Sequence, residues 1–267
     1  MHILWLDIYS GKYLDFLARS KNPNIRTLVF TPNPEILLKA HRDDDFYEVL
    51  KKADFLLPDA TGLYTASLIK EETPYLKALF MTFFKRKELE KKYGEIIQGS
   101  NLTKDLVAYA IEEWSKILMI DNYRIDDPQN EFEKRKMVVQ GKLPELFREK
   151  FPNLDVEILF DGEMSDEKIA ELIREKNIKY VFACIGMKLQ EKRLVGIFSH
   201  LPDNQKVLWI WVGSSFDYLL GLQKRAPEFF QKYWIEWLYR FLQDPKRRWR
   251  RIKAALIDFP RLIQSQK

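Results

Sequence analysis

Short apolar runs alternate with amphipathic stretches along most of the chain. Runs rich in β-branched and aromatic residues predict buried strands, whereas apolar residues at three- and four-residue spacing predict helices. The predicted strands are HILWLDI, RTLVFT, DFLLP, ILMI, VEILF, KYVFACI and VLWIWV. Helical segments separate most of these runs, which requires crossover connections. The pattern therefore predicts an α/β fold, with a mainly parallel, Rossmann-like sheet covered by helices on both faces.

The last part of the chain has a different pattern, and we predict two regions: an α/β core over 1–224 and a basic, amphipathic helical appendage over 225–267. Pro245 starts the last helical pattern, whose apolar face carries Trp249, Ile252, Leu256, Phe259 and Ile263. Between Arg240 and Arg261 there are eight Lys or Arg residues and two acidic residues. This bias is typical of a surface that binds something anionic.

Composition narrows the choice of partner only slightly. The net charge of +5 and the pI of about 9.0 suit nucleic acid, an anionic bilayer or a phosphorylated substrate. The single cysteine, Cys184, excludes an internal disulfide and lies in an apolar run, where a buried, inert thiol is expected. The amino terminus has no basic region before a long apolar core, and no apolar run is long enough to span a bilayer. We therefore expect a cytoplasmic protein with at most peripheral membrane contact.

Ligands of parallel sheets bind where loops leave the carboxyl ends of the strands. Three loops of this kind carry polar residues: TPNPE with Thr31 and Asn33, PDATG with Asp59, and IGMKLQE with Gln190 and Glu191. Asn33 also stands where the cap of a following helix is expected, with a proline and a glutamate directly after it.

These motifs resemble those of the WecG/TagA/CpsF glycosyltransferases. The resemblance is strongest in the segments GSSFDYLLGLQKRAP and EWLYRFLQDPKRRWRR, which are similar to the family's carboxyl-terminal signature. The three loops are similar, in order, to the family's T-x-N, PDG-x-G and G-x-P-K-Q-E elements, although Ala60 replaces a glycine and the Pro-Lys pair is lost. The resemblance covers roughly the whole chain.

Three departures from the family pattern stand out. In the family an arginine usually precedes the stretch V-T-G-S-D-L. The corresponding stretch here is EIIQGSNL, which has Ile96 at the position of that arginine. The glycine-rich turn that the family has after the strand ILMI is also missing. The segment 74–92, PYLKALFMTFFKRKELEKK, is an apparent insertion. Its apolar residues at helical spacing beside a basic run are compatible with a helix lying on a bilayer, and equally with a buried helix or a dimer contact.

The chemistry of glycosyl transfer with inversion needs a base and a cationic group for the departing diphosphate. We interpret Asp59 as the base, and capping of the following helix is its structural alternative. We interpret Thr31, Asn33 and Gln190 as groups that orient the substrate. Glu191 is interpreted instead as an ordinary carboxylate of the following helix. The resemblance assigns the cations to the tail: Arg225, Arg240, Arg247 and Arg250. No convincing metal pair is present, because the run from Asp43 to Asp45 stands at a helix start. We therefore expect no metal and no cofactor.

The resulting hypothesis is an inverting, metal-independent glycosyltransferase. The resemblance implies a nucleotide diphosphate sugar donor, such as UDP-linked N-acetylmannosamine. It also implies a polyprenyl diphosphate-linked acceptor, which is bound at an anionic membrane surface. The sequence does not decide whether the protein forms a homo-oligomer. Two alternatives remain. A catalytically inactive scaffold homologue would account for Ala60 and Ile96, and a nucleic-acid-binding module would account for the basic tail but would bind with a steep salt dependence.

Overall fold

The protein is described from a computed structural model, which covers residues 1–121, 141–213, 215–224, 226–227, 229–230, 236–243 and 245–266. Within the helices near the carboxyl terminus, the side chains of residues 237, 240, 243 and 246–248 lie outside this description. All structural statements below refer to the described residues.

A six-stranded sheet forms the centre of the molecule, with strand order β4-β3-β8-β7-β5-β6 and every neighbouring pair parallel. The strands are β3 (Thr27–Phe30), β4 (Phe55–Leu56), β5 (Ile117–Asp121), β6 (Val156–Phe160), β7 (Tyr180–Cys184) and β8 (Leu208–Trp211). The predicted parallel α/β fold is confirmed, and six of the seven predicted strands form this sheet.

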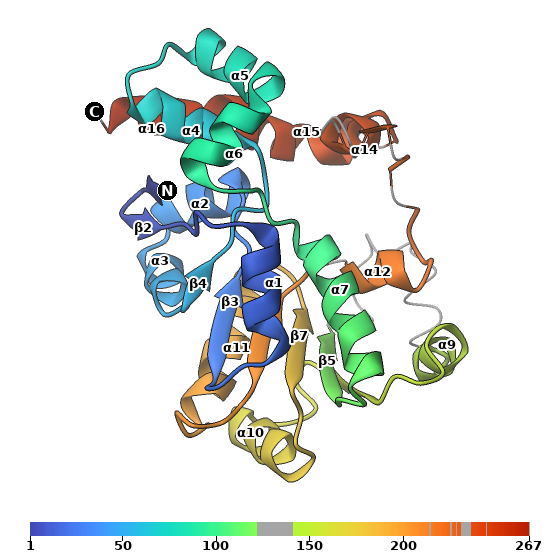
Figure 1. Cartoon of the computed structure of the whole chain (residues 1–267). Coiled ribbons are helices and arrows are strands. Elements are labelled where there is room, and N and C mark those ends of the chain that lie inside the picture. The colour runs from blue at the N-terminus through green and yellow to red at the C-terminus, as the bar shows by residue number, and fades with distance from the viewer. Residues whose placement is uncertain are drawn as a thin grey trace.

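Successive side chains of each strand point to opposite faces of the sheet, so both faces carry apolar side chains that must be buried. Helices cover both faces. One core contains Leu118 and Ile120, whereas the other contains Ile117 and Met119. The second core is closed by α1 (Tyr13–Lys21), α7 (Gly99–Glu112), α9 (Leu143–Lys150) and α12 (Ser215–Leu219). The first is closed by α2 (Pro34–His41), α3 (Asp44–Lys51), α4 (Gly62–Lys70), α10 (Asp166–Glu175) and α11 (Leu189–Ser199). Figure 1 shows this arrangement.

The first predicted strand, HILWLDI, is wrong as a single strand. The segment folds into a hairpin of two-residue strands, β1 (His2–Ile3) and β2 (Leu6–Asp7), that pair antiparallel outside the main sheet. Leu4 and Trp5 between them both have positive φ, 50° and 64°, which is the backbone of a tight hairpin turn. Apolar composition alone could not reveal this turn, because neither residue is a typical turn former.

The carboxyl-terminal helices are α14 (Glu236–Gln243), α15 (Pro245–Lys253), the π-helical η1 (Ala254–Asp258) and α16 (Phe259–Ser265). They lie at the same end of the molecule as α4 (Figure 1). Phe259 and Ile263 are buried in the core that also contains residues of α2 and α4. Arg251 forms an ion pair with Glu35 of α2, with 3.3 Å between Nε and Oε2. The end of the predicted apolar stripe therefore rests on the protein, whereas Trp249 is exposed.

The apparent insertion forms a pair of helices, α5 (Tyr75–Phe84) and α6 (Arg86–Tyr93). One side of α5 packs on α4: Ala78 is buried, and the Thr82 hydroxyl forms a buried hydrogen bond of 2.9 Å with the hydroxyl of Thr65. The Tyr75 hydroxyl donates a hydrogen bond of 2.5 Å to the Leu256 carbonyl of η1. The insertion is thus fixed both to the core and to the carboxyl-terminal helices.

Candidate functional site

Strands β3 and β8 lie side by side at the middle of the sheet, and the chain leaves them toward opposite faces. Helix α2 follows β3 on one face, and α12 follows β8 on the other. Such a switch point is where parallel sheets form a ligand crevice. Thr31, directly after β3, is buried here, and its hydroxyl donates a long hydrogen bond of 3.4 Å to the carbonyl of Trp211. Thr31 thus lies at this switch point, and its role as a site residue stays a prediction.

Asp59 lies in the loop after β4, next to this point, and its side chain is half-buried. Its amide donates to the Pro32 carbonyl at 3.3 Å, so the loops after β3 and β4 are joined. Its carboxylate Oδ1 accepts a hydrogen bond of 2.9 Å from the amide of Gly99, the first residue of α7. The positive end of a helix dipole stabilises a negative charge placed there. The carboxylate is therefore held in one orientation by a helix 40 residues further along the chain.

Asn33 has the capping role expected from the sequence. Its Oδ1 accepts a hydrogen bond of 3.1 Å from the Ile36 amide, with Pro34 at the first turn of α2. A Cβ atom on Gly62 would lie 2.7 Å from the ring of Pro34, so the start of α4 requires a residue without a side chain. This close packing keeps Asn33 near the Asp59 loop.

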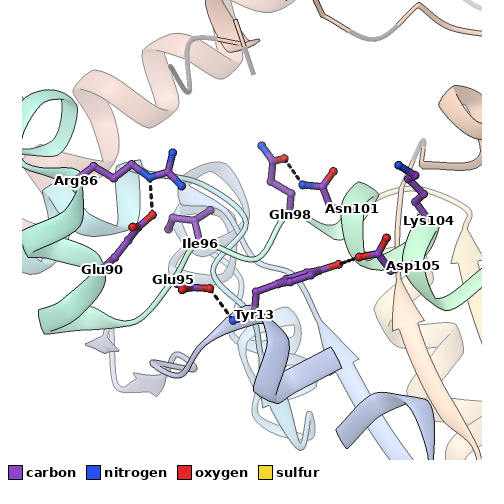
Figure 2. A pocket seen from close by; sticks show the side chains of 9 residues that line it. All are labelled: Tyr13, Arg86, Glu90, Glu95, Ile96, Gln98, Asn101, Lys104 and Asp105. Atoms are coloured by element: carbon purple, nitrogen blue, oxygen red, sulfur yellow. Dashed lines mark hydrogen bonds and ion pairs between the residues drawn. The ribbon is translucent and has the colours of Figure 1, made fainter. Parts of the chain in front are cut away.

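A pocket of about 410 Å³ lies at the first turns of α7. Figure 2 shows its lining, which comes from the start of α1, from α6, from the segment after α6 and from α7. The lining residues are Tyr13, Arg86, Glu90, Glu95, Ile96, Gln98, Asn101, Lys104 and Asp105. Gln98 and Asn101 flank Gly99, the partner of the Asp59 carboxylate, and are joined to each other by a hydrogen bond of 3.0 Å. Asp59 therefore adjoins this pocket through the start of α7 without being part of its lining.

The pocket carries charges of both signs. Arg86 and Lys104 stand against three carboxylates, Glu90, Glu95 and Asp105. Arg86 belongs to the insertion and is ion-paired with Glu90. It lines the same pocket as Ile96, the residue that stands where the family resemblance leads one to expect an arginine. The insertion thus brings a guanidinium group to the pocket from a different element.

Tyr13 lies at the base of the pocket and has two polar anchors. Its hydroxyl donates a hydrogen bond of 2.5 Å to Asp105, and its amide donates one of 2.8 Å to Glu95. Burial, together with the hydrogen bond and charge of Asp105, raises the pKa of the Tyr13 hydroxyl far above its ordinary value. Tyr13 is therefore a neutral hydrogen-bonding group rather than a proton acceptor.

The loop after β7 places Gln190 and Glu191 in the interior. Both side chains are fully buried at the start of α11. The Gln190 Oε1 accepts a hydrogen bond of 3.1 Å from the Gly186 amide, and among the described residues its Nε2 has no hydrogen-bond partner. Desolvation raises the pKa of Glu191 to about 7. Glu191 is thus not an ordinary helical carboxylate, and Gln190 uses its carbonyl oxygen to close its own loop.

The structure describes only some of the arginines predicted to bind the diphosphate. Arg225 lies outside the described residues, and so do the side chains of Arg240 and Arg247. Arg250 is exposed on α15 and is not among the residues that line the pocket. Arg251, the next arginine of α15, forms the ion pair with Glu35 of α2.

The described residues contain no group of three or more His, Cys, Asp or Glu side chains placed to hold a metal ion. Asp43 instead caps α3 by accepting from the Phe46 amide at 3.1 Å, and it also binds Lys188. None of the helices in the described part of the chain has the length and apolar character needed to cross a bilayer.

Sequence reasoning missed the pocket itself. Tyr13, Arg86 and Lys104 come from three separate segments, and none of them stands directly after a strand. The basic run Lys85–Lys87 is a sequence signal for a cationic site near the pocket. By itself, however, this run indicates only membrane contact or packing. The order of elements in the sequence does not show that residues of α1, α6 and α7 line one pocket.

Comparison with known proteins agrees with these motifs. The glycosyl transferase WecG/TagA/CpsF family model matches residues 4–92 and 134–267, leaving out the segment that contains Ile96 and Gly99. An N-acetylglucosaminyldiphosphoundecaprenol N-acetyl-beta-D-mannosaminyltransferase of Bacillus subtilis (strain 168) is 27% identical over 242 residues, covering 90% of this chain and 80% of the relative. A protein of the same name from Staphylococcus aureus (strain MW2) is 25% identical over 234 residues, covering 87% of this chain and 77% of the relative. The chain therefore belongs to the WecG/TagA/CpsF family and is a glycosyltransferase.

Proposed function

We propose that this glycosyltransferase moves N-acetylmannosamine, or a closely related sugar, from a nucleoside diphosphate donor to N-acetylglucosamine carried on a polyprenyl diphosphate. The names of the relatives support the acceptor class and the transferred sugar. The observation that carries the proposal is the oriented carboxylate of Asp59 at the carboxyl edge of the sheet, beside a pocket with two cationic side chains.

In the proposed reaction, the acceptor hydroxyl oxygen attacks the anomeric carbon while the bond from that carbon to the diphosphate breaks. Asp59 accepts the hydroxyl proton, and the nucleoside diphosphate leaves with the bonding electrons. Attack opposite to the leaving group inverts the configuration. The hydrogen bond from the Gly99 amide to Oδ1 orients the carboxylate for this step.

The departing diphosphate needs positive charge or hydrogen-bond donors. Arg86 and Lys104 are the cations that line the pocket, and Gln98 and Asn101 add amide groups beside them. In Figure 2 the side chains of Arg86, Gln98 and Lys104 point to the same side of the pocket. We assign the donor diphosphate to this side, with Arg225, Arg240, Arg247 and Arg250 as further candidates from the tail. This arrangement supports a reaction without a metal.

A polyprenyl chain stays in the bilayer, so the proposed acceptor requires the enzyme to work at a membrane surface. We propose a peripheral association with the inner, anionic face of the cell membrane, driven by basic and apolar side chains. A homo-oligomer is compatible with this arrangement but is not required by it.

The test is direct detection of transfer from radiolabelled UDP-N-acetylmannosamine to N-acetylglucosamine-diphosphate-lipid, with and without EDTA. Formation of a labelled disaccharide lipid of inverted configuration, undiminished by the chelator, is the expected result. Loss of activity with EDTA and its recovery with a divalent ion would overturn the metal-free mechanism. No transfer from any of a panel of nucleotide sugars, together with no thermal stabilisation by them, would favour an inactive scaffold homologue.

A further inference from the structure

Helix α5 presents an apolar face that the fold itself does not use. Leu76, Phe80 and Phe84 recur at four-residue spacing, and their exposed fractions are 77%, 56% and 72%. The rings of Phe80 and Phe84 lie against each other, with their centroids 4.7 Å apart. Such a continuous apolar stripe on an exposed helix is typical of a surface that contacts a partner.

The opposite face of the same helix is fixed to the protein. Ala78 and Thr82 are buried against α4, and the Tyr75 hydroxyl is bonded to the Leu256 carbonyl. These contacts use one face for packing and leave the face with Leu76, Phe80 and Phe84 pointing outward. Helix α5 is thus anchored by its other face, and it lies at the end of the molecule where the carboxyl-terminal helices lie (Figure 1).

Basic residues occur on the same pair of helices as the stripe. Lys77 on α5 and Lys87 and Lys91 on α6 are exposed, and among the described residues none of the three forms an ion pair. Neighbouring basic residues, in contrast, have acidic partners: Lys85 binds Glu88, and Arg86 binds Glu90. Apolar side chains bordered by free ammonium groups match the interface of an anionic bilayer.

We propose that the outer face of α5, with Leu76, Phe80 and Phe84 inserted and Lys77, Lys87 and Lys91 against the headgroups, docks the protein on an anionic lipid bilayer. The charge pattern argues against a second copy of this chain as the occupant. A twofold contact between these helix pairs would gather the three lysines of each copy at one interface, and the added like charge opposes such a contact.

This docking surface deepens the proposed function, because it also orients the pocket. Arg86, which lines the pocket, begins α6 two residues after Phe84. A bilayer-bound α5 therefore keeps the pocket near the level of the lipid phosphates, where the diphosphate of a lipid-linked acceptor lies. The assignment of the surface itself does not depend on the transfer chemistry, so the two can fail separately.

The test is co-sedimentation of the full chain with vesicles of phosphatidylcholine alone and with added phosphatidylglycerol. The variant Leu76→Ser, Phe80→Ser, Phe84→Ser is expected to lose about tenfold or more in partition onto the anionic vesicles. The variant Lys77→Glu, Lys87→Glu, Lys91→Glu is expected to lose the preference for phosphatidylglycerol. Transfer to a short-chain, water-soluble acceptor is expected to stay unchanged in both, because none of these side chains lines the pocket.

The matched control is Leu14→Ser, Ile25→Ser, Trp114→Ser, which removes three apolar side chains that are 71%, 58% and 79% exposed elsewhere on the protein. This control is expected to bind vesicles like the wild type. Equal vesicle binding by the α5 variant and the wild type would overturn the proposal, and so would a wild type that ignores anionic vesicles. Light scattering adds a third overturning outcome: a wild-type dimer that the α5 variant dissociates while vesicle binding is unaltered.

Discussion

Two acidic residues stand at the carboxyl edge of the same sheet, and their environments differ in every respect that matters for chemistry. Asp59 is half-buried and accepts a hydrogen bond from the amino end of α7, beside a pocket. Glu191 is fully buried, and desolvation raises its pKa to about 7. A half-buried carboxylate that is oriented beside a pocket can act as a base, and we expect the raised pKa of Glu191 to appear mainly in the pH dependence of stability.

The largest expected effect comes from Asp59→Asn. The amide keeps an oxygen for the Gly99 hydrogen bond but cannot accept a proton, so turnover is expected to fall by about 10³-fold with the fold intact. The matched control is Asp54→Asn, at the opposite end of β4, where the carboxylate accepts a hydrogen bond of 2.8 Å from the Leu28 amide. Steady-state kinetics and circular dichroism measure both. Near-normal turnover in Asp59→Asn would remove the basis of the base assignment.

Glu191→Gln is expected to change the pH dependence of stability and to leave turnover within a few-fold of the wild type. The folded-state pKa of about 7 lies above the ordinary value of 4.5, so the folded protein retains a proton that the unfolded chain has released between these values. The free energy of unfolding therefore falls as the pH rises through this window, by about 3 kcal/mol for a shift of this size. The glutamine variant is expected to lack this fall and to be the more stable protein at pH 8.

Urea unfolding at pH 5 and pH 8 measures this effect. Glu171→Gln, at an exposed position of α10, serves as the control and should leave the pH dependence unchanged. An unaltered pH dependence in Glu191→Gln would contradict the raised pKa. A collapse of turnover equal to that of Asp59→Asn would instead show that the two carboxylates share the chemistry.

Arg86→Ala tests whether the pocket beside Asp59 binds the donor diphosphate. Loss of the guanidinium is expected to raise KM for the nucleotide sugar about tenfold with a smaller change in kcat. The ion pair with Glu90 is partly buried but joins residues one helical turn apart, so the free energy of unfolding should change by about 1 kcal/mol or less. Lys85→Ala, next in sequence and outside the pocket, is the control. Identical KM values for the two variants would place the donor elsewhere.

The smallest expected effect is that of Thr31→Val, which removes a hydroxyl whose hydrogen bond to Trp211 is long, at 3.4 Å. The loss of stability should stay within about 1 kcal/mol, because the bond is weak and the valine fills a similar volume. A role in orienting the sugar predicts, in addition, a turnover reduced by several-fold. Calorimetry and kinetics on the same samples separate the two contributions, and a change in melting temperature without any kinetic change would make Thr31 purely structural.

Much of the fold could be predicted because buried strands and amphipathic helices carry local signals. The runs RTLVFT, ILMI, VEILF and KYVFACI correspond to β3, β5, β6 and β7, and Asn33 caps α2 as its sequence context predicts. The prediction of one strand over HILWLDI was wrong because the turn through Leu4 and Trp5 depends on two unusual backbone conformations. Apolar residues in a hairpin and in a single strand look alike in sequence.

Sequence by itself determined the α/β class, the family and the three loops in which Thr31, Asp59 and Gln190 lie, because these features depend on residues close together in the chain. Tertiary structure alone decided what each of these residues faces. It placed Gly99 against Asp59, buried the Glu191 carboxyl group, and brought Arg86 to the pocket beside Ile96. Contacts between segments tens of residues apart set desolvation and charge, and no local pattern encodes either quantity.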